Sequence, residues 1–149
     1  MTDTQAYVEF SSRSAAELAV KYLALWNEPD ADRRRRTIAE LWTADGRHIL
    51  QPPQEIRAIA AQPGIAMTAI LSAQGYEEIE ARATSVYEHW VGSEGLTFRG
   101  RDDADRLGDV VKLHWEAVDR DGTVLAVGLT FLVLAAGGRI ERDYTFIVG

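Results

Sequence analysis

The segment Asp109-Val-Val-Lys-Leu-His-Trp-Glu-Ala-Val118 decides how this chain should fold. Apolar and polar side chains alternate along it, as expected for a β-strand with one buried face. The next segment, 123–134, is apolar on both faces, and a further alternating segment covers 139–148. Glycine-containing loops at 119–122 and 135–138 join the three segments, as is typical of hairpins. The C-terminal half therefore predicts an antiparallel meander.

The N-terminal half has the spacing of helices. Ser14 begins a capping-box pattern, which predicts a first helix running from there to Trp26. Either Asp30 or Asp32 is expected to cap a second helix, which ends near Gly46.

A short strand is expected at 47–51, followed by two helical pieces at 54–62 and 65–73 and a longer helix from Tyr76 onward. Helices thus come first and strands last, without βαβ alternation. This order predicts an α+β domain in which the helices cover a curled sheet.

The composition limits the possible classes of protein. A chain of 149 residues with 46% hydrophobic content fits one domain, 1–149, in which 1–11 is expected to be flexible or loosely packed. The formal net charge of -7 repels phosphate backbones and anionic lipid, so we expect neither nucleic acid nor a membrane as partner. Cysteine is absent, which excludes disulfides and thiolate chemistry. No signal-peptide pattern or long apolar stretch occurs, and a cytoplasmic location is expected.

Three groups of residues resemble a known superfamily. They are Tyr22-Leu-Ala-Leu-Trp-Asn27, Ile38-Ala-Glu-Leu-Trp42 with Ala44-Asp-Gly46, and Gly138-Arg-Ile-Glu-Arg-Asp-Tyr-Thr-Phe146. With them the chain resembles the nuclear transport factor 2-like superfamily, in particular SnoaL-like proteins related to polyketide cyclases and ketosteroid isomerases. The resemblance implies a cone-shaped curved antiparallel sheet wrapped by N-terminal helices, a cystatin-like α+β barrel with an apolar pocket. It does not imply one activity, because some relatives are enzymes and others only bind.

The resemblance also assigns positions from the ketosteroid isomerase site. Tyr22 falls at the oxyanion-hole tyrosine, and its place on the apolar face of the first helix independently points it inward. Gln51 falls at the general-base aspartate, and Thr130 falls near a second carboxylic acid. An amide cannot take a proton and a threonine hydroxyl is a far weaker acid, so steroid-type proton transfer through these two positions is not expected.

Asp143 is a carboxylate in a suggestive place, because relatives have pocket-lining residues at this point of the last strand. An aspartate among apolar neighbours is expected to have a raised pKa, which makes it a usable acid or base near neutrality. The alternative is that Asp143 shares a polar outer face with Glu141 and Thr145. A pairing with Arg139 or Arg142 is a further alternative.

The predicted site combines two catalytic residues with aromatic and polar walls. Asp143 would move the proton, and Tyr22 would hold a developing oxyanion. The predicted substrate-binding residues are Trp26, Trp42, Gln51, Leu113, Trp115 and Thr130. All four tryptophans, Trp90 included, lie on faces predicted to point inward, where they serve equally as core or as pocket wall.

Metal and cofactor sites are not expected. His48, His89 and His114 have no metal-ligand spacing with one another or with a carboxylate, and strand parity places His114 on an exposed or interfacial side. Phosphate-binding loops and nucleophile elbows are also absent from the sequence.

Three functions stay open at this level. The first is a cofactor-independent acid–base enzyme, of isomerase, cyclase or hydrolase type, acting on an apolar cyclic molecule. The second is a non-catalytic protein that binds a small apolar molecule, and the third is a dimeric accessory module with a filled core. The outer apolar row of the strand at 123–134 predicts a homodimer through the sheet in each case.

Overall fold

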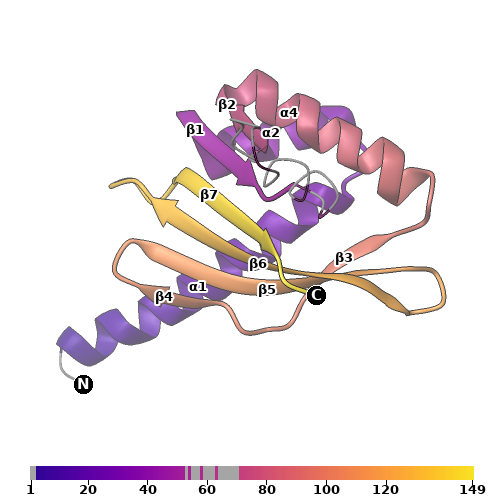
Figure 1. The fold of residues 1–149 in the computed structure, drawn as a ribbon. Helices are drawn as coiled ribbons and strands as arrows, with labels where there is room; N and C mark the ends of the chain where they lie inside the picture. The colour runs from indigo at the N-terminus through magenta and orange to yellow at the C-terminus, as the bar shows by residue number, and fades with distance from the viewer. Residues whose placement is uncertain (1–2, 53, 55–57, 59–62, 64–70) are drawn as a thin grey trace.

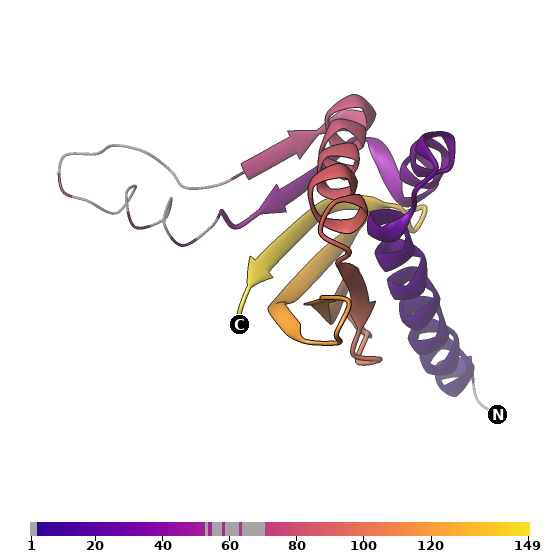
Figure 2. The ribbon, with the colours of Figure 1, turned by 90° about the vertical axis from the view of Figure 1, so that its right-hand side faces the viewer.

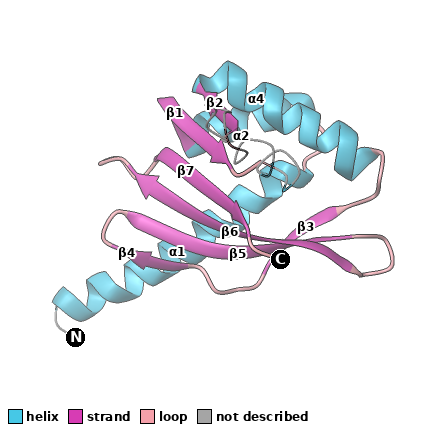
Figure 3. Ribbon diagram, in the orientation of Figure 1, coloured by secondary structure: helices cyan, strands magenta, loops and turns pink. Residues whose placement is uncertain are grey.

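The computed structural model describes residues 3–52, 54, 58, 63 and 71–149. The helices are α1 (Asp3–Asn27), α2 (Ala31–Leu41) and α4 (Gly75–Val86), which continues into the π-helix η1 (Tyr87–Gly92). The strands are β1 (Trp42–Leu50), β2 (Leu71–Gln74), β3 (Thr97–Gly100), β4 (Asp105–Leu107), β5 (Val110–Val118), β6 (Val124–Leu134) and β7 (Ile140–Ile147). The described helices all precede β3 to β7 in the chain. Figure 3 shows these helices beside the sheet, so the predicted α+β class is confirmed.

The strands form one curved sheet in the order β2-β1-β7-β6-β5-β3, with β4 also paired to β5. The predicted meander is confirmed, since β5, β6 and β7 pair antiparallel in sequence order. The sheet is not wholly antiparallel, however, because β1 lies parallel to β7. Figures 1 and 2 show α1, α2 and α4 gathered on one side of the sheet, which encloses an interior between helices and strands.

The sequence predicted the start of the second helix correctly but not the start of the first. α1 begins at Asp3, so Ser14 lies inside this helix and does not cap it. A Ser and a Glu three residues apart also occur within helices, and the spacing alone does not distinguish the two cases. The prediction that 1–11 packs loosely stays a prediction. At α2, the side chain of Asp30 accepts a hydrogen bond from the backbone N–H of Arg33 at 2.9 Å, which makes Asp30 the cap.

The second helix ends five residues earlier than the predicted end near Gly46, because Trp42 already belongs to β1. The pairing of β1 with β7 is irregular between Trp42 and Arg47. Gly46 lies in this irregular stretch, where a Cβ would sit 2.7 Å from Cδ1 of Trp42. The Ala-Asp-Gly motif therefore allows the strand to pass close to a buried indole.

The segment after β1 is described only at its ends. The helical pieces predicted at 54–62 and 65–73 lie mostly outside the described residues. The helix predicted for the end of the second piece, 71–73, was wrong, because Leu71–Gln74 is strand β2, which pairs antiparallel with β1. Among the described helices, none is long and apolar enough to cross a membrane.

Candidate functional site

The hydroxyl of Tyr22 lies at the closed end of an interior pocket. Tyr22 is buried because it shares the inward face of α1 with Ala15, Ala19 and Trp26, at helical spacing. Its ring meets that of Trp26 edge to face, with the centroids 6.0 Å apart. The hydroxyl donates a hydrogen bond to Oδ2 of Asp143 at 2.5 Å. The predicted inward orientation of Tyr22 is confirmed.

Asp143 is fully buried, with 0% of its surface exposed. A bulge explains its inward direction, because Val133 of β6 pairs with Arg142 whereas Leu134 pairs with Ile140. The extra residue lets Ile140 and Asp143 both face the interior, while the intervening part of the strand faces out. The alternative of a polar outer face for Asp143 was therefore wrong.

A chain of hydrogen bonds with a fixed direction ends on this carboxyl. The indole N–H of Trp115 can only donate, and it donates to Oγ1 of Thr130 at 3.0 Å. Thr130 Oγ1 lies 2.8 Å from Oγ1 of Thr145, and Thr145 donates to Oδ1 of Asp143 at 2.7 Å. Each threonine thus accepts from one side and donates to the other, and every proton points toward Asp143.

His48 faces Asp143 from the neighbouring strand. The parallel register of β1 and β7 places the two residues side by side, with Nε2 of His48 3.7 Å from Oδ2 of Asp143. This distance is too long for a hydrogen bond. On the opposite side of the imidazole, Nη1 of Arg82 on α4 lies 2.9 Å from Nδ1 and 2.9 Å from the carbonyl oxygen of His48.

Burial shifts the titration of the three buried groups. Loss of hydration raises the pKa of Asp143 to about 7, although hydrogen bonds from Tyr22 and Thr145 and the charge of Arg82 oppose the shift. Burial and the Asp143 carboxylate raise the pKa of Tyr22 above its usual value. Burial, helped by the positive charge of Arg82, lowers the pKa of His48 to about 3. Near neutral pH the site therefore holds a neutral imidazole, a neutral phenol and a carboxyl that can both hold and release a proton.

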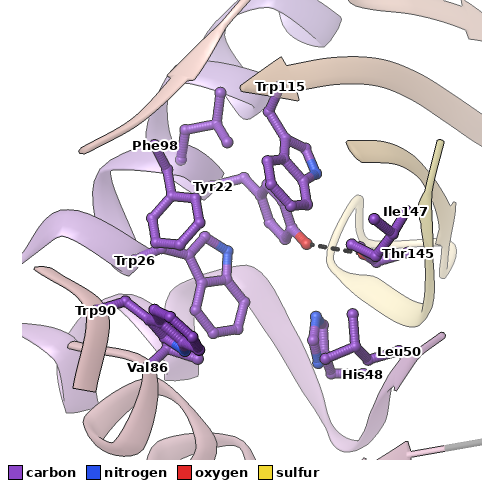
Figure 4. A pocket seen from close by; sticks show the side chains of 11 residues that line it. Tyr22, Trp26, His48, Leu50, Val86, Trp90, Phe98, Trp115, Thr145 and Ile147 are labelled. Carbon is purple, nitrogen blue, oxygen red and sulfur yellow. Dashed lines mark hydrogen bonds between the residues drawn. The ribbon is translucent and has the colours of Figure 1, made fainter. Parts of the chain in front are cut away.

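The pocket in front of these groups is mostly apolar and has a volume of about 160 Å³. Figure 4 shows Trp26, Phe98 and Trp115 on one side, with Tyr22, His48 and Thr145 at its polar end. Leu23, Leu50, Val86, Trp90 and Ile147 complete the lining. An apolar cavity of roughly 150 Å³ accepts a benzene-sized molecule in a well-studied lysozyme variant. The volume of this pocket thus suits one ring.

The predicted site residues divide into those that line the pocket and those that lie behind it. Tyr22, Trp26 and Trp115 line it. Asp143 and Thr130 lie behind the lining and reach it through hydrogen bonds.

The other three predicted residues have structural contacts instead. Trp42 is fully buried in the core, where its ring packs against Tyr22. Leu113 is likewise buried in the core. Gln51 accepts a hydrogen bond from the backbone N–H of Ile147 at 2.9 Å and so fastens the end of β1 to β7.

The sequence did not indicate His48, Thr145 or Arg82 as site residues. His48 and Thr145 become neighbours of Asp143 only through the parallel pairing of β1 with β7, which joins segments far apart in the chain. The inward direction predicted for Trp90 was wrong in part, because this residue lies in the π-helix η1 and is 52% exposed at the pocket. Within the described residues, no cluster of three metal-ligating side chains occurs.

Replacing Gly128 by alanine should displace the indole that forms one wall of the pocket. A Cβ at this position would lie 2.0 Å from ring atoms of Trp115, which packs flat on the glycine. We expect a loss of about 1–3 kcal/mol in the free energy of unfolding from overpacking. The indole N–H signal of Trp115 in an NMR spectrum should also move, because its bond to Thr130 breaks.

Gly137 to alanine is the matched control, since a Cβ there meets nothing within 4 Å. Equal stability of the two variants and an unmoved Trp115 signal would contradict the tight packing of this wall.

No protein-family model and no curated protein matches this chain. Solved structures, however, are similar to it in fold. A candidate isomerase of the SnoaL-like family from Agrobacterium tumefaciens superposes with a TM-score of 0.73, at 23% identity over 92% of this chain and 99% of its own. A SnoaL-like protein of unknown function from Burkholderia thailandensis gives 0.62 at 16% identity, over 92% and 97%. A Catenulispora acidiphila protein with a ketosteroid isomerase-like fold, solved with trimethylamine, gives 0.58 at 18% identity, over 87% and 84%.

Other similar structures are described as NTF2-like or as a candidate polyketide cyclase. At such identities the similarity establishes the fold and leaves the activity open. The chain therefore has the nuclear transport factor 2-like fold that its sequence motifs predicted.

Proposed function

We propose that this protein binds a small, single-ring molecule with one oxygen function and catalyses proton transfer on it without a cofactor. The observation that supports this most is the 2.5 Å hydrogen bond between Tyr22 and Asp143 at the closed end of an apolar pocket. A buried carboxyl with a pKa of about 7 can both hold and release a proton near neutrality. The apolar walls favour a ring, and the hydroxyl favours an oxygen atom on that ring.

The proton would travel through Tyr22, because Asp143 lies behind the pocket lining. In the protonated state Asp143 donates to the phenol oxygen, and Tyr22 donates its own proton to the carbonyl oxygen of a bound cyclic ketone. Water at the open side of the pocket takes a proton from the carbon next to the carbonyl, which yields the enol, a hydronium ion and a carboxylate at Asp143. The reverse sequence returns a proton to carbon and restores the acid.

Exchange of the hydrogens of cyclohexanone with D2O tests this proposal. We expect NMR to show faster loss of the signals next to the carbonyl with the protein than in buffer. The accelerated rate should fall as the pH rises through about 7, because the protonated form of Asp143 is the active one. Binding without acceleration would remove the catalytic half of the proposal, and absence of binding would contradict the whole.

A non-catalytic binding protein is the second candidate. The position of Asp143 favours this candidate, because Asp143 does not line the pocket. The polar groups that a ligand would contact at the inner end of the pocket are the hydroxyls of Tyr22 and Thr145 and the imidazole of His48. Binding of cyclohexanone with an unchanged exchange rate is the result that this candidate predicts.

We also propose that two copies associate through the outer face of the sheet. Phe146 on β7 is 44% exposed, and its ring pairs edge to face with that of Phe131 at 6.0 Å. Leu125 on β6 is 57% exposed, and its strand parity is that of Phe131, so it adds exposed apolar surface to this face. Because such a patch is costly in water, a second copy is the simplest cover.

Light scattering after size-exclusion chromatography should show a dimer at micromolar concentration and a monomer after Phe146→Asp. Val20→Asp is the control, because Val20 is 71% exposed on α1, which lies on the other side of the sheet. A wild-type monomer would contradict the proposed association.

A further inference from the structure

We propose that Arg82 is a positioning residue of the pocket, which holds His48 as the neutral tautomer with its proton on Nε2 and so makes the imidazole a hydrogen-bond donor to the bound molecule. This inference rests on the proposed function only for the identity of that molecule. The tautomer itself follows from contacts within the protein.

The contact between Arg82 and Nδ1 of His48 fixes the tautomer. A guanidinium group has donors and no acceptor, so its N–H, 2.9 Å from Nδ1, must donate to an unprotonated nitrogen. The single proton of a neutral imidazole then resides on Nε2. An imidazolium would place an N–H against an N–H, which this geometry disfavours.

Arg82 is itself held in place by backbone oxygens. The same nitrogen donates to the carbonyl of His48 at 2.9 Å and to that of Leu71 at 3.3 Å. These oxygens belong to the paired strands β1 and β2, so α4 is fastened to this edge of the sheet at the point where the imidazole emerges. Among the described residues, the hydrogen bonds of Arg82 go to the imidazole and to these two carbonyl oxygens and not to a carboxylate, which is consistent with a role toward the imidazole.

The Nε2–H of His48 points to the polar end of the pocket. Among the described residues its charged neighbour is Asp143, whose Oδ2 at 3.7 Å lies beyond hydrogen-bond distance. The titratable groups that face the ring are Arg82 from α4, Asp143 from β7 and Tyr22 from α1. The ring of Trp26, with its centroid 4.9 Å away, covers one imidazole face and limits its rotation.

This arrangement defines which ligands the pocket accepts. His48 presents its Nε2–H, and Tyr22 presents its hydroxyl proton when Asp143 is protonated and donates to the phenol oxygen. No lysine or arginine lines the pocket within the described residues. A neutral molecule with an acceptor oxygen, such as a ketone, can accept from both groups. A neutral imidazole that polarises a carbonyl is a known electrophile in enzymes, and its neutrality there likewise depends on a lowered pKa.

NMR of the imidazole nitrogens tests the inference without any ligand. In the wild-type protein labelled with ¹⁵N-histidine, we expect Nδ1 of His48 to show the shift of an unprotonated nitrogen and Nε2 that of a protonated one, unchanged from pH 5 to pH 8. His48→Gln identifies the signals among those of His89 and His114. A wild-type spectrum with the proton on Nδ1, or with both nitrogens protonated at pH 7, would overturn the proposal.

Three variants separate positioning from folding. Arg82→Met should give mixed tautomers and raise the pKa of His48 by roughly one unit or more, since a positive neighbour is removed. Arg82→Lys, which keeps the charge and a donor, should restore part of the wild-type pattern. Arg35→Gln is the control, because Arg35 pairs with Glu80 on α4 at 3.1 Å and does not contact His48.

An Arg82→Met protein with unchanged tautomer and pKa would also overturn the proposal. If this variant fails to fold, the wild-type and Arg82→Lys spectra still show whether the His48 proton resides on Nε2 and whether a cation at position 82 keeps it there. Failure of the ketone exchange assay with the expected His48 spectrum would remove the proposed catalysis and leave the role of Arg82 intact.

Discussion

The variant Asp143→Asn should become steadily more stable than the wild type as the pH rises from about 4 to about 7. In the folded protein the pKa of Asp143 is raised from 3.8 to about 7 by burial, so the folded state keeps the proton in a range where the unfolded state has lost it. The contribution of Asp143 to stability is complete below about pH 4 and is lost as the pH rises through 7. The whole shift corresponds to about 4 kcal/mol, at 1.36 kcal/mol per pKa unit.

An asparagine has the shape of the carboxyl and no charge, so it avoids this loss. Its amide oxygen can accept from Thr145, and its amide nitrogen can donate to Tyr22, which preserves both contacts. Urea unfolding at several pH values measures the difference between variant and wild type. Asp45→Asn removes an exposed carboxylate of β1 and should lack the effect. A difference that does not change with pH would contradict the buried, neutral carboxyl.

The wild-type protein alone would hide this behaviour, because His48 contributes with the opposite sign. The folded-state pKa of His48 is about 3, so only the unfolded state binds its proton between about pH 3 and 6.5. Stability from His48 therefore rises with pH in the range where stability from Asp143 falls. The two slopes oppose each other between about pH 4 and 6.5, so a single substitution at either residue reveals its contribution more clearly than the wild type does.

Much of the fold was predictable because it depends on local patterns. Alternation in β5 and the doubly apolar β6 located the meander, and the two candidate caps, Asp30 and Asp32, located the start of α2 to within two residues. Trp42 was misassigned because an apolar residue at the end of a helix and one at the start of a strand fit the same spacing.

A site residue was predictable only where a single helix or strand determines the direction of its side chain. Tyr22 lies on a helix face that its neighbours define, and its orientation followed from them. Asp143 required the bulge in β7, and His48 required the parallel pairing of distant strands. Arg82 lies on a helix that the sequence predicted, but the contact of this helix with β1 and β2 could not be predicted. Contacts between distant segments depend on the assembled sheet, which periodicity does not encode.

Tyr22→Phe should reduce protein-catalysed exchange of cyclohexanone about 10²- to 10⁴-fold, the usual contribution of a positioned acid or base. The substitution removes one oxygen atom, which is both the donor to Asp143 and the group at the polar end of the pocket. Binding of the ring should weaken much less, because Trp26, Phe98 and the phenyl ring itself remain. Exchange rates and binding constants from the same NMR titration separate the two effects.

Tyr76→Phe is the matched control for the loss of a hydroxyl. Tyr76 donates to the carbonyl of Trp42 at 3.0 Å and does not line the pocket, so its removal should leave the exchange rate nearly unchanged. Equal losses in both variants would point to a general change of structure. Full activity in Tyr22→Phe would mean that the proton reaches the ligand by another route, for which Thr145 is the remaining hydroxyl bonded to Asp143. A loss confined to Tyr22→Phe would show that the buried carboxyl acts on the ligand through the phenol oxygen and not through Thr145, the other pocket hydroxyl bonded to Asp143.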